Sequence, residues 1–108
     1  MKKIEIVDCP GLSDLLNTVL QRISSHPRRA EKLQSVLTPE KCDLVIHEIF
    51  NVFPRCVEFQ LAVLCFGLID YENRWSYERF GDEYGLSERE VLKIEHNCLV
   101  AILNFLDV

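Results

Sequence analysis

The sequence predicts an all-α fold of five or six short helices that share one hydrophobic core. Apolar residues recur along most of the chain at the three- and four-residue spacing of amphipathic helices. Prolines and small polar residues interrupt this spacing at short intervals, as they do where helices begin and end. The 108 residues, of which 48% are hydrophobic, are enough for one domain with its own core.

Residues 3–7 alternate weakly between polar and apolar side chains, which is typical of an extended segment. No second strand is evident, and a lone strand leaves backbone N–H and C=O groups without partners. We therefore expect an extended arm, or a strand that pairs with a second copy of the chain.

The first helix is predicted over residues 12–23, where six apolar residues fall on one face. Ser13 is its predicted N-cap, because a serine hydroxyl can accept a hydrogen bond from a free backbone N–H. The sequence SSHP at 24–27 ends the helix, since the residue before a proline avoids helical angles. A second helix, short and basic, is expected over residues 28–37.

Thr38 and Pro39 predict the start of a third helix, with Thr38 as the cap and Pro39 at the first helical position. Its apolar face contains Cys42, Val45, Ile46, Ile49, Phe50 and Phe53. Pro54 is expected to end this helix and to begin the next one. Residues 54–68 are apolar on most sides and are therefore the predicted central buried helix, with Gly67 in the left-handed conformation at its end.

A polar connection at 69–74 leads to the fifth predicted helix. Ser76 is its predicted N-cap, and Trp75 and Phe80 occupy the two positions of a hydrophobic staple. This helix is expected to stop near Tyr84.

A glycine turn joins the fifth helix to the last. Gly85 supplies the sharp bend, Leu86 is expected to point inward, and Ser87 caps a helix that extends to about Phe105. A helix, a short turn with glycine and a second capped helix together form the pattern of a helix-turn-helix unit.

Four groups of residues in this part of the chain match a known pattern in type and spacing. They are the triplet Phe66-Gly67-Leu68, the residues Ser76, Glu78, Phe80 and Gly81, the turn Tyr84-Gly85-Leu86-Ser87, and the helix residues Val91, Ile94, Glu95, Cys98, Leu99 and Ile102. Together they resemble region four of the bacterial sigma factors, over roughly residues 43–103. The resemblance implies an all-helical unit whose last helix reads a promoter element and whose apolar hollow grips a flap of RNA polymerase.

The resemblance divides the chain into two parts. Residues 1–38 form an N-terminal arm and helical extension that is expected to serve packing or self-association, and residues 39–108 form the helix-turn-helix domain. A sigma factor also needs a segment that opens the promoter, for which the sequence leaves no room. We therefore expect a stand-alone, divergent domain that regulates transcription.

Seven residues of the last helix and its cap are the candidates for contact with DNA or a protein partner: Ser87, Glu88, Arg89, Glu90, Leu92, Lys93 and Asn97. The resemblance implies that Ser87, Arg89 and Lys93 touch phosphate or base edges, whereas Glu88, Glu90 and Leu92 stand where the family usually has arginine. Residues 75–98 hold six acidic and three basic residues, which opposes phosphate binding.

Two functional interpretations of these residues therefore remain open, together with a purely structural one. The protein binds promoter DNA, or it acts as an adaptor whose acidic face engages RNA polymerase or another transcription regulator. Alternatively, Glu88, Glu90 and Glu95 form a solvated face near a helix N-terminus, which favours acids. In that case Arg89 and Lys93 pair with acids nearby.

A candidate basic patch lies upstream and consists of Arg22, Arg28, Arg29 and Lys32. Residues 1–41 contain seven Lys/Arg and five Asp/Glu, and residues 42–108 contain five and twelve, so the two parts carry +2 and −7 of the net −5. The patch would supplement DNA binding if the fold brings it alongside the last helix. Otherwise it is a solvated face.

The C-terminal residues 99–108 include eight apolar residues, more than one apolar stripe requires. The helix at 12–23 is expected to cover one flank. A second copy or a partner would cover the rest, and a second copy would make a homodimer through the last helix.

The sequence gives no indication of an enzyme, a cofactor or a metal site. His26, His47 and His96 lack a Cys or His at ligand spacing. No catalytic triad, glycine-rich phosphate loop or catalytic carboxylate pair is evident either.

The cysteines and the hydropathy pattern point to a cytoplasmic protein without a membrane partner. The five cysteines are odd in number and form no C-x-x-C pair, which favours free thiols in a reducing compartment, with Cys65 and Cys98 in the core. No apolar run approaches the ~20 residues of a membrane span, and the N-terminal residues do not resemble a secretory signal.

Overall fold

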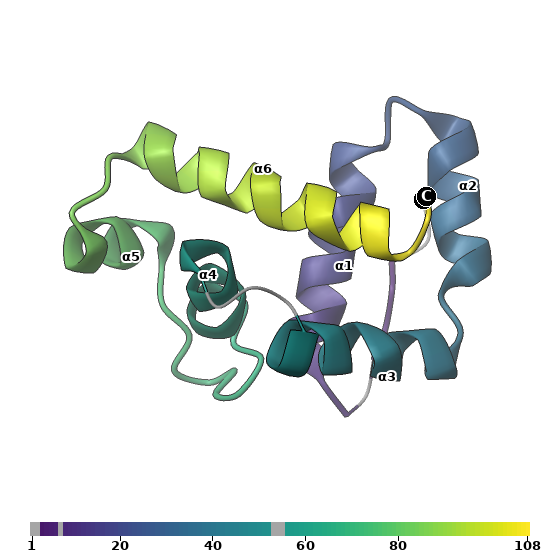
Figure 1. Cartoon of the computed structure of the whole chain (residues 1–108), viewed down its shortest axis with the longest axis horizontal. Coiled ribbons are helices and arrows are strands. Elements are labelled where there is room, and N and C mark those ends of the chain that lie inside the picture. Colours follow the sequence, from purple (N-terminus) through teal and green to yellow (C-terminus); the bar gives the residue numbers. More distant parts are fainter. Residues whose placement is uncertain (1–2, 7, 53–55) are drawn as a thin grey trace.

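A computed structural model of the chain describes residues 3–6, 8–52 and 56–108. Within these ranges the chain forms six α-helices and one π-helical turn, without a β-strand, which confirms the all-α prediction (Figure 1). The elements are α1 (Pro10–Arg22), α2 (Pro27–Val36), α3 (Pro39–His47), the π-helical turn η1 (Glu48–Val52), α4 (Val57–Cys65), α5 (Tyr77–Tyr84) and α6 (Glu88–Phe105).

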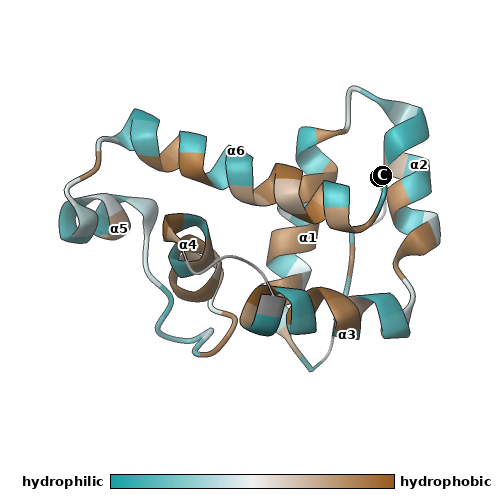
Figure 2. Cartoon of the chain, in the orientation of Figure 1, coloured by the Kyte–Doolittle hydropathy of each residue, from teal (hydrophilic) through white to brown (hydrophobic). Residues whose placement is uncertain are grey.

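The longest helix, α6, is the element around which the others are arranged, and α1, α4 and α5 all pack against it (Figure 1). In a molecule of 38 × 28 × 24 Å, α5 lies at one end of the long axis and α2 at the other. Every helix contributes to the core, for example through Leu12, Leu33, Val45, Leu61, Phe80 and Val91. Figure 2 shows that hydrophobic residues are concentrated in the second half of α6.

The first helix starts two residues earlier than the sequence predicts, because Pro10 takes its first position and Cys9 is the N-cap. The prediction that Ser13 is the N-cap is therefore wrong. Ser13 lies within the first turn of α1 and is buried, and its hydroxyl donates a hydrogen bond to the backbone carbonyl of Ile4. The serine thus binds the N-terminal arm rather than the free N–H groups of its own helix.

The N-terminal arm lies extended along α1. The Ile4 N–H donates to Oδ1 of Asn17 over 2.6 Å, and Nδ2 of Asn17 donates to the Ile4 carbonyl over 2.9 Å. The side-chain amide of Asn17 therefore takes the place that a neighbouring strand would have. Residues 3–6 have no regular secondary structure; pairing with a second copy stays a prediction, and residue 7 lies outside the described residues.

Helix α2 begins and ends one residue earlier than predicted, and α3 begins where predicted but ends at His47, where the π-helical turn η1 replaces the rest of the predicted helix. Thr38 caps α3 by accepting a hydrogen bond from the Lys41 N–H over 3.3 Å, with Pro39 at the first helical position. Val45 and Ile49 of the predicted apolar face are buried, and Cys42, Ile46 and Phe50 are partly buried. The predictions for Phe53 and Pro54 fall outside the described residues.

Leu61, Ala62 and Cys65 of helix α4 are buried and its other residues are partly buried, so none of α4 is fully exposed. It ends as predicted, with Gly67 in the left-handed conformation at φ 68°. The Leu68 N–H then donates to the Val63 carbonyl over 3.2 Å, which closes the helix end.

The turn between α5 and α6 has the geometry that its glycine predicts. Gly85 adopts φ 66° and ψ 38°, the Leu86 N–H donates to the Gly81 carbonyl over 2.8 Å, and Ser87 caps α6. Leu86 is partly buried against the core, as expected.

The cap of α5 is also confirmed, since the Ser76 hydroxyl accepts from the Arg79 N–H over 3.1 Å. Phe80 is fully buried and stacks on Tyr84 with ring centroids 4.4 Å apart. The ring of Trp75 instead packs under the Arg79 guanidinium, 4.1 Å from its centroid. A staple between Trp75 and Phe80 stays a prediction.

The C-terminal segment is largely covered by the chain itself. Helix α1 packs on α6 as expected, and only Val100 and Phe105 among the large apolar residues of 99–108 remain 38% exposed. These two are five positions apart and therefore point in directions roughly 140° apart around the helix. A homodimer through α6 stays a prediction, and these two residues do not provide it with one continuous apolar face.

The described ranges contain no disulfide and no cluster of three or more His, Cys, Asp or Glu side chains suited to a metal ion. Cys65 and Cys98 are buried, as predicted. None of the described helices combines the length and hydropathy needed to cross a lipid bilayer.

Candidate interaction surfaces of the last helix

The seven candidate residues of the last helix separate into three groups with different surroundings. Ser87 and Glu90 form a capping box: the Glu90 N–H donates to the Ser87 hydroxyl over 3.2 Å, and the Ser87 N–H donates to the Glu90 carboxylate over 3.0 Å. The backbone N–H and then the hydroxyl of Ser87 lower the pKa of Glu90. The Glu90 carboxylate is therefore turned back toward the helix start.

Glu95 is a buried carboxylate, so its expected place on a solvated face is wrong. Its side chain is 5% exposed and forms an ion pair with Arg22 of α1, while the Tyr77 hydroxyl of α5 donates to its other oxygen. Burial and then this hydrogen bond raise the pKa of Tyr77. Glu95 thus joins α6 to α1 and α5.

Loss of the Arg22 side chain is expected to destabilise the fold by about 2 kcal/mol, because it leaves the Glu95 carboxylate buried with the Tyr77 hydroxyl alone. This is less than for a fully buried pair, since the Arg22 side chain is 49% exposed. Urea unfolding of Arg22→Ala measures the loss. Arg29→Ala is the control, because Arg29 is exposed and its contact among the described residues is a 3.4 Å hydrogen bond to the Val108 carbonyl.

The double variant Arg22→Met/Glu95→Leu is expected to recover most of that loss, because it removes both charges from the buried site. An additive loss in the double variant would contradict the assignment of the pair.

Arg89, Lys93 and Asn97 belong to the second group, on the outer face of α6. We define this face by five exposed residues that share one side of the helix: Arg89, Lys93, His96, Asn97 and Val100. None of these five residues is acidic, and the exposed Glu90 of the capping box borders them. Asn97 lies at its margin, with Nδ2 3.5 Å from Oε1 of Glu58 on α4. Among the described residues, Arg22 and Glu95 form the one ion pair. Arg89 and Lys93 therefore do not form the expected surface pairs with nearby acids.

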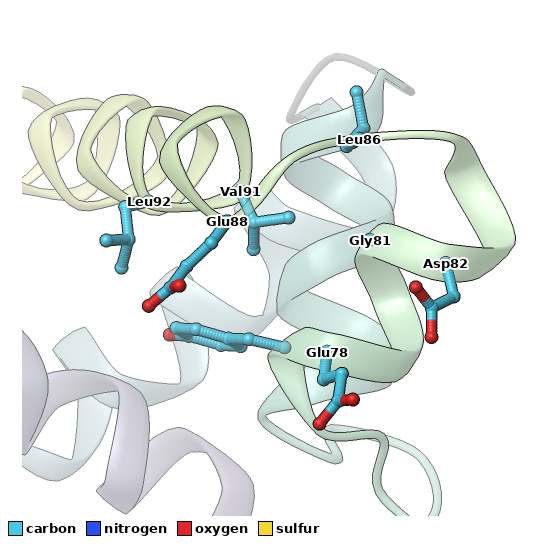
Figure 3. A pocket seen from close by; sticks show the side chains of 8 residues that line it. Glu78, Gly81, Asp82, Leu86, Glu88, Val91 and Leu92 are labelled. Carbon is cyan, nitrogen blue, oxygen red and sulfur yellow. The ribbon is translucent and has the colours of Figure 1, made fainter.

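Glu88 and Leu92 form the third group and lie beside α5. A hollow of about 430 Å³ separates the start of α6 from α5. Its lining consists of Tyr77, Glu78, Gly81, Asp82, Leu86, Glu88, Val91 and Leu92. Figure 3 shows Glu78 and Asp82 on the α5 side of this α5–α6 hollow and Glu88 and Leu92 on the α6 side.

The basic patch that the sequence suggests does not lie beside the start of α6. Arg22 is engaged with Glu95. Arg28, Arg29 and Lys32 are exposed on α2, at the end of the molecule opposite α5 (Figure 1). Charge on α2 therefore cannot compensate for acids near the α5–α6 turn.

The candidates chosen from the sequence do not include four polar or charged residues of these surfaces: Tyr77, Glu78, Asp82 and His96. A local signal was present for three of them. Glu78 and Asp82 are four apart on one helix, and His96 follows Lys93 by three. Arg22 and Glu95 are 73 positions apart, so only the fold brings them together.

Comparison of the chain with models of protein families, with curated proteins and with solved structures gives no match. The resemblance to sigma region four therefore depends on the motif residues between positions 66 and 102.

Proposed function

We propose that this protein is a DNA-binding regulator of transcription in which α4, α5 and α6 act like sigma region four. The observation that carries the proposal is the outer face of α6, which is exposed and presents Arg89 and Lys93, neither of which forms an ion pair with another described residue. Two of the acids that argued against DNA binding have structural roles: Glu90 caps α6 and Glu95 is buried.

An exposed helix that follows a short turn can enter the major groove of DNA with the residues near its start on the base edges. Arg89 and Lys93 would contact phosphates or guanine, and Asn97 and His96 would lie further along the same face. Two full positive charges neutralise few phosphates, so binding by this face alone is weak. A regulator of this kind needs a second contact, with RNA polymerase or another transcription regulator.

The double variant Arg89→Ala/Lys93→Ala is expected to bind a mixed-sequence duplex at least about tenfold more weakly at low salt, and to reduce the salt slope by about 2. Fluorescence anisotropy across a salt series measures both quantities. Arg28→Ala/Arg29→Ala is the matched control, because it removes the same charge from the opposite end of the molecule.

Equal losses in the two double variants would contradict the placement of DNA on α6. No binding by the unaltered protein at low salt would contradict DNA binding itself. The chain would then be better explained as a protein-interaction adaptor with a region four-like fold, which co-purification with RNA polymerase subunits would test.

A further inference from the structure

The α5–α6 hollow is a second surface, separate from the outer face of α6. Glu88 and Leu92 border it, whereas Arg89 and Lys93 lie on the outer side of the same helix. We propose that this hollow docks a cationic segment of a partner protein, with an apolar side chain inside the hollow and Lys or Arg side chains at its acidic rim. The proposal goes beyond DNA binding and does not depend on it.

The charge of the hollow selects a cationic occupant. Glu78, Asp82 and Glu88 are exposed and make no hydrogen bond or ion pair within the described part of the chain. The nearby Arg79 is stacked on the Trp75 ring and does not line the hollow. Three carboxylates around one depression repel nucleic acid and attract Lys and Arg side chains.

The apolar part of the hollow provides a place for one large side chain. Leu86, Val91 and Leu92 line it, and Leu92 is 41% exposed one turn beyond Glu88. Gly81 lines the hollow where α5 closely approaches the backbone of Leu86. An apolar anchor surrounded by polar contacts is the usual composition of a protein interface. The occupant is therefore a segment with Leu, Ile or Phe between basic residues.

The test uses the full ¹⁵N-labelled chain and two synthetic peptides, one of lysines and leucines and one in which serine replaces each leucine. The lysine–leucine peptide is expected to shift the backbone amides of Gly81, Leu86 and Leu92. It should bind Glu78→Gln/Asp82→Asn/Glu88→Gln about tenfold more weakly, since each exposed ion pair contributes roughly 1.5- to 5-fold.

The matched control for charge is Glu31→Gln/Glu40→Gln/Asp43→Asn, which changes the net charge equally and spares the hollow. It should alter affinity by less than about twofold. Leu92→Ala should weaken binding of the lysine–leucine peptide and leave binding of the serine peptide unchanged. Val100→Ala removes a similarly exposed side chain outside the hollow and should affect neither.

The proposal is overturned if neither peptide shifts these amides at low salt, or if the two charge variants weaken binding equally. The amide signals could also shift without peptide as the protein concentration rises, both in the hollow and at Arg28, Arg29 and Lys32. This result would show that a second copy of the chain occupies the hollow, and it would also overturn the proposal. Arg89→Ala/Lys93→Ala should keep peptide binding, so a failure of DNA binding remains distinguishable.

Discussion

Raising the pH from about 9 to about 11 is expected to lower the free energy of unfolding by about 3–5 kcal/mol. The cause is a set of buried acids in the core. Burial raises the pKa of the Cys98 thiol to about 12 and that of Cys65 to about 11, from 9.0. Burial and the hydrogen bond to Glu95 also raise the pKa of Tyr77.

The direction follows from which state holds the protons. A thiol with a raised pKa stays protonated in the folded chain while the unfolded chain releases its proton, so alkali favours unfolding. Its contribution to stability is complete below the unfolded pKa and is lost as the pH rises toward the folded pKa. Each such group adds a slope of up to about 1.4 kcal/mol per pH unit.

Urea unfolding at several pH values in the presence of a reductant measures this slope. Cys98→Ala is expected to flatten it by up to about 1.4 kcal/mol per pH unit, because one titrating group is removed. Leu99→Ala is the control, because the Leu99 side chain is next to Cys98 and only 2% exposed but does not titrate. A slope unchanged by Cys98→Ala would show that this thiol ionises as readily in the folded chain as in the unfolded one.

Replacement of Gly81 by alanine is expected to cost about 3 kcal/mol, because the new methyl group has no room. A Cβ on Gly81 would lie 2.8 Å from the backbone oxygen of Leu86 and 3.4 Å from Cγ2 of Val91. The backbone oxygen cannot turn aside as a flexible side chain would. Helix α5 and the turn would have to separate, which would also change the α5–α6 hollow.

Gly85→Ala is the matched comparison, because a side chain at Gly85 would have space but an unfavourable backbone angle. Its Cβ would meet nothing within 4 Å, but its φ of 66° is unfavourable for an L-residue, so about 1 kcal/mol is expected. Thermal or urea unfolding of both variants compares the two costs. A smaller loss for Gly81→Ala than for Gly85→Ala would contradict the close approach of α5 to the turn.

The elements that the sequence predicts correctly depend on short-range chemistry. Thr38, Ser76 and Ser87 each bond to an N–H three residues later, so their role is visible within one turn of sequence. Gly67 and Gly85 are in the left-handed conformation because glycine tolerates it at helix ends. Sequence reasoning therefore recovers where most helices start and stop.

The errors occur where a distant segment changes the role of a residue. Ser13 looks like a cap, but the arm supplies the Ile4 carbonyl as its acceptor. Glu95 looks like an exposed acid, but α1 supplies Arg22. The α5–α6 hollow is not visible in the sequence for the same reason, since its lining residues come from two helices that only the fold brings together.

The contact between Arg22 and Glu95 has a consequence for experiments that dissect the chain. A truncation that starts at residue 39 would delete the guanidinium, the whole of α1 and the apolar cover that α1 gives α6. The remaining fragment would lose both the ion-pair partner of Glu95 and part of the packing of α6, so its failure to function would say little about the deleted segment. Single substitutions in the intact polypeptide are the sounder way to assign roles to its two halves.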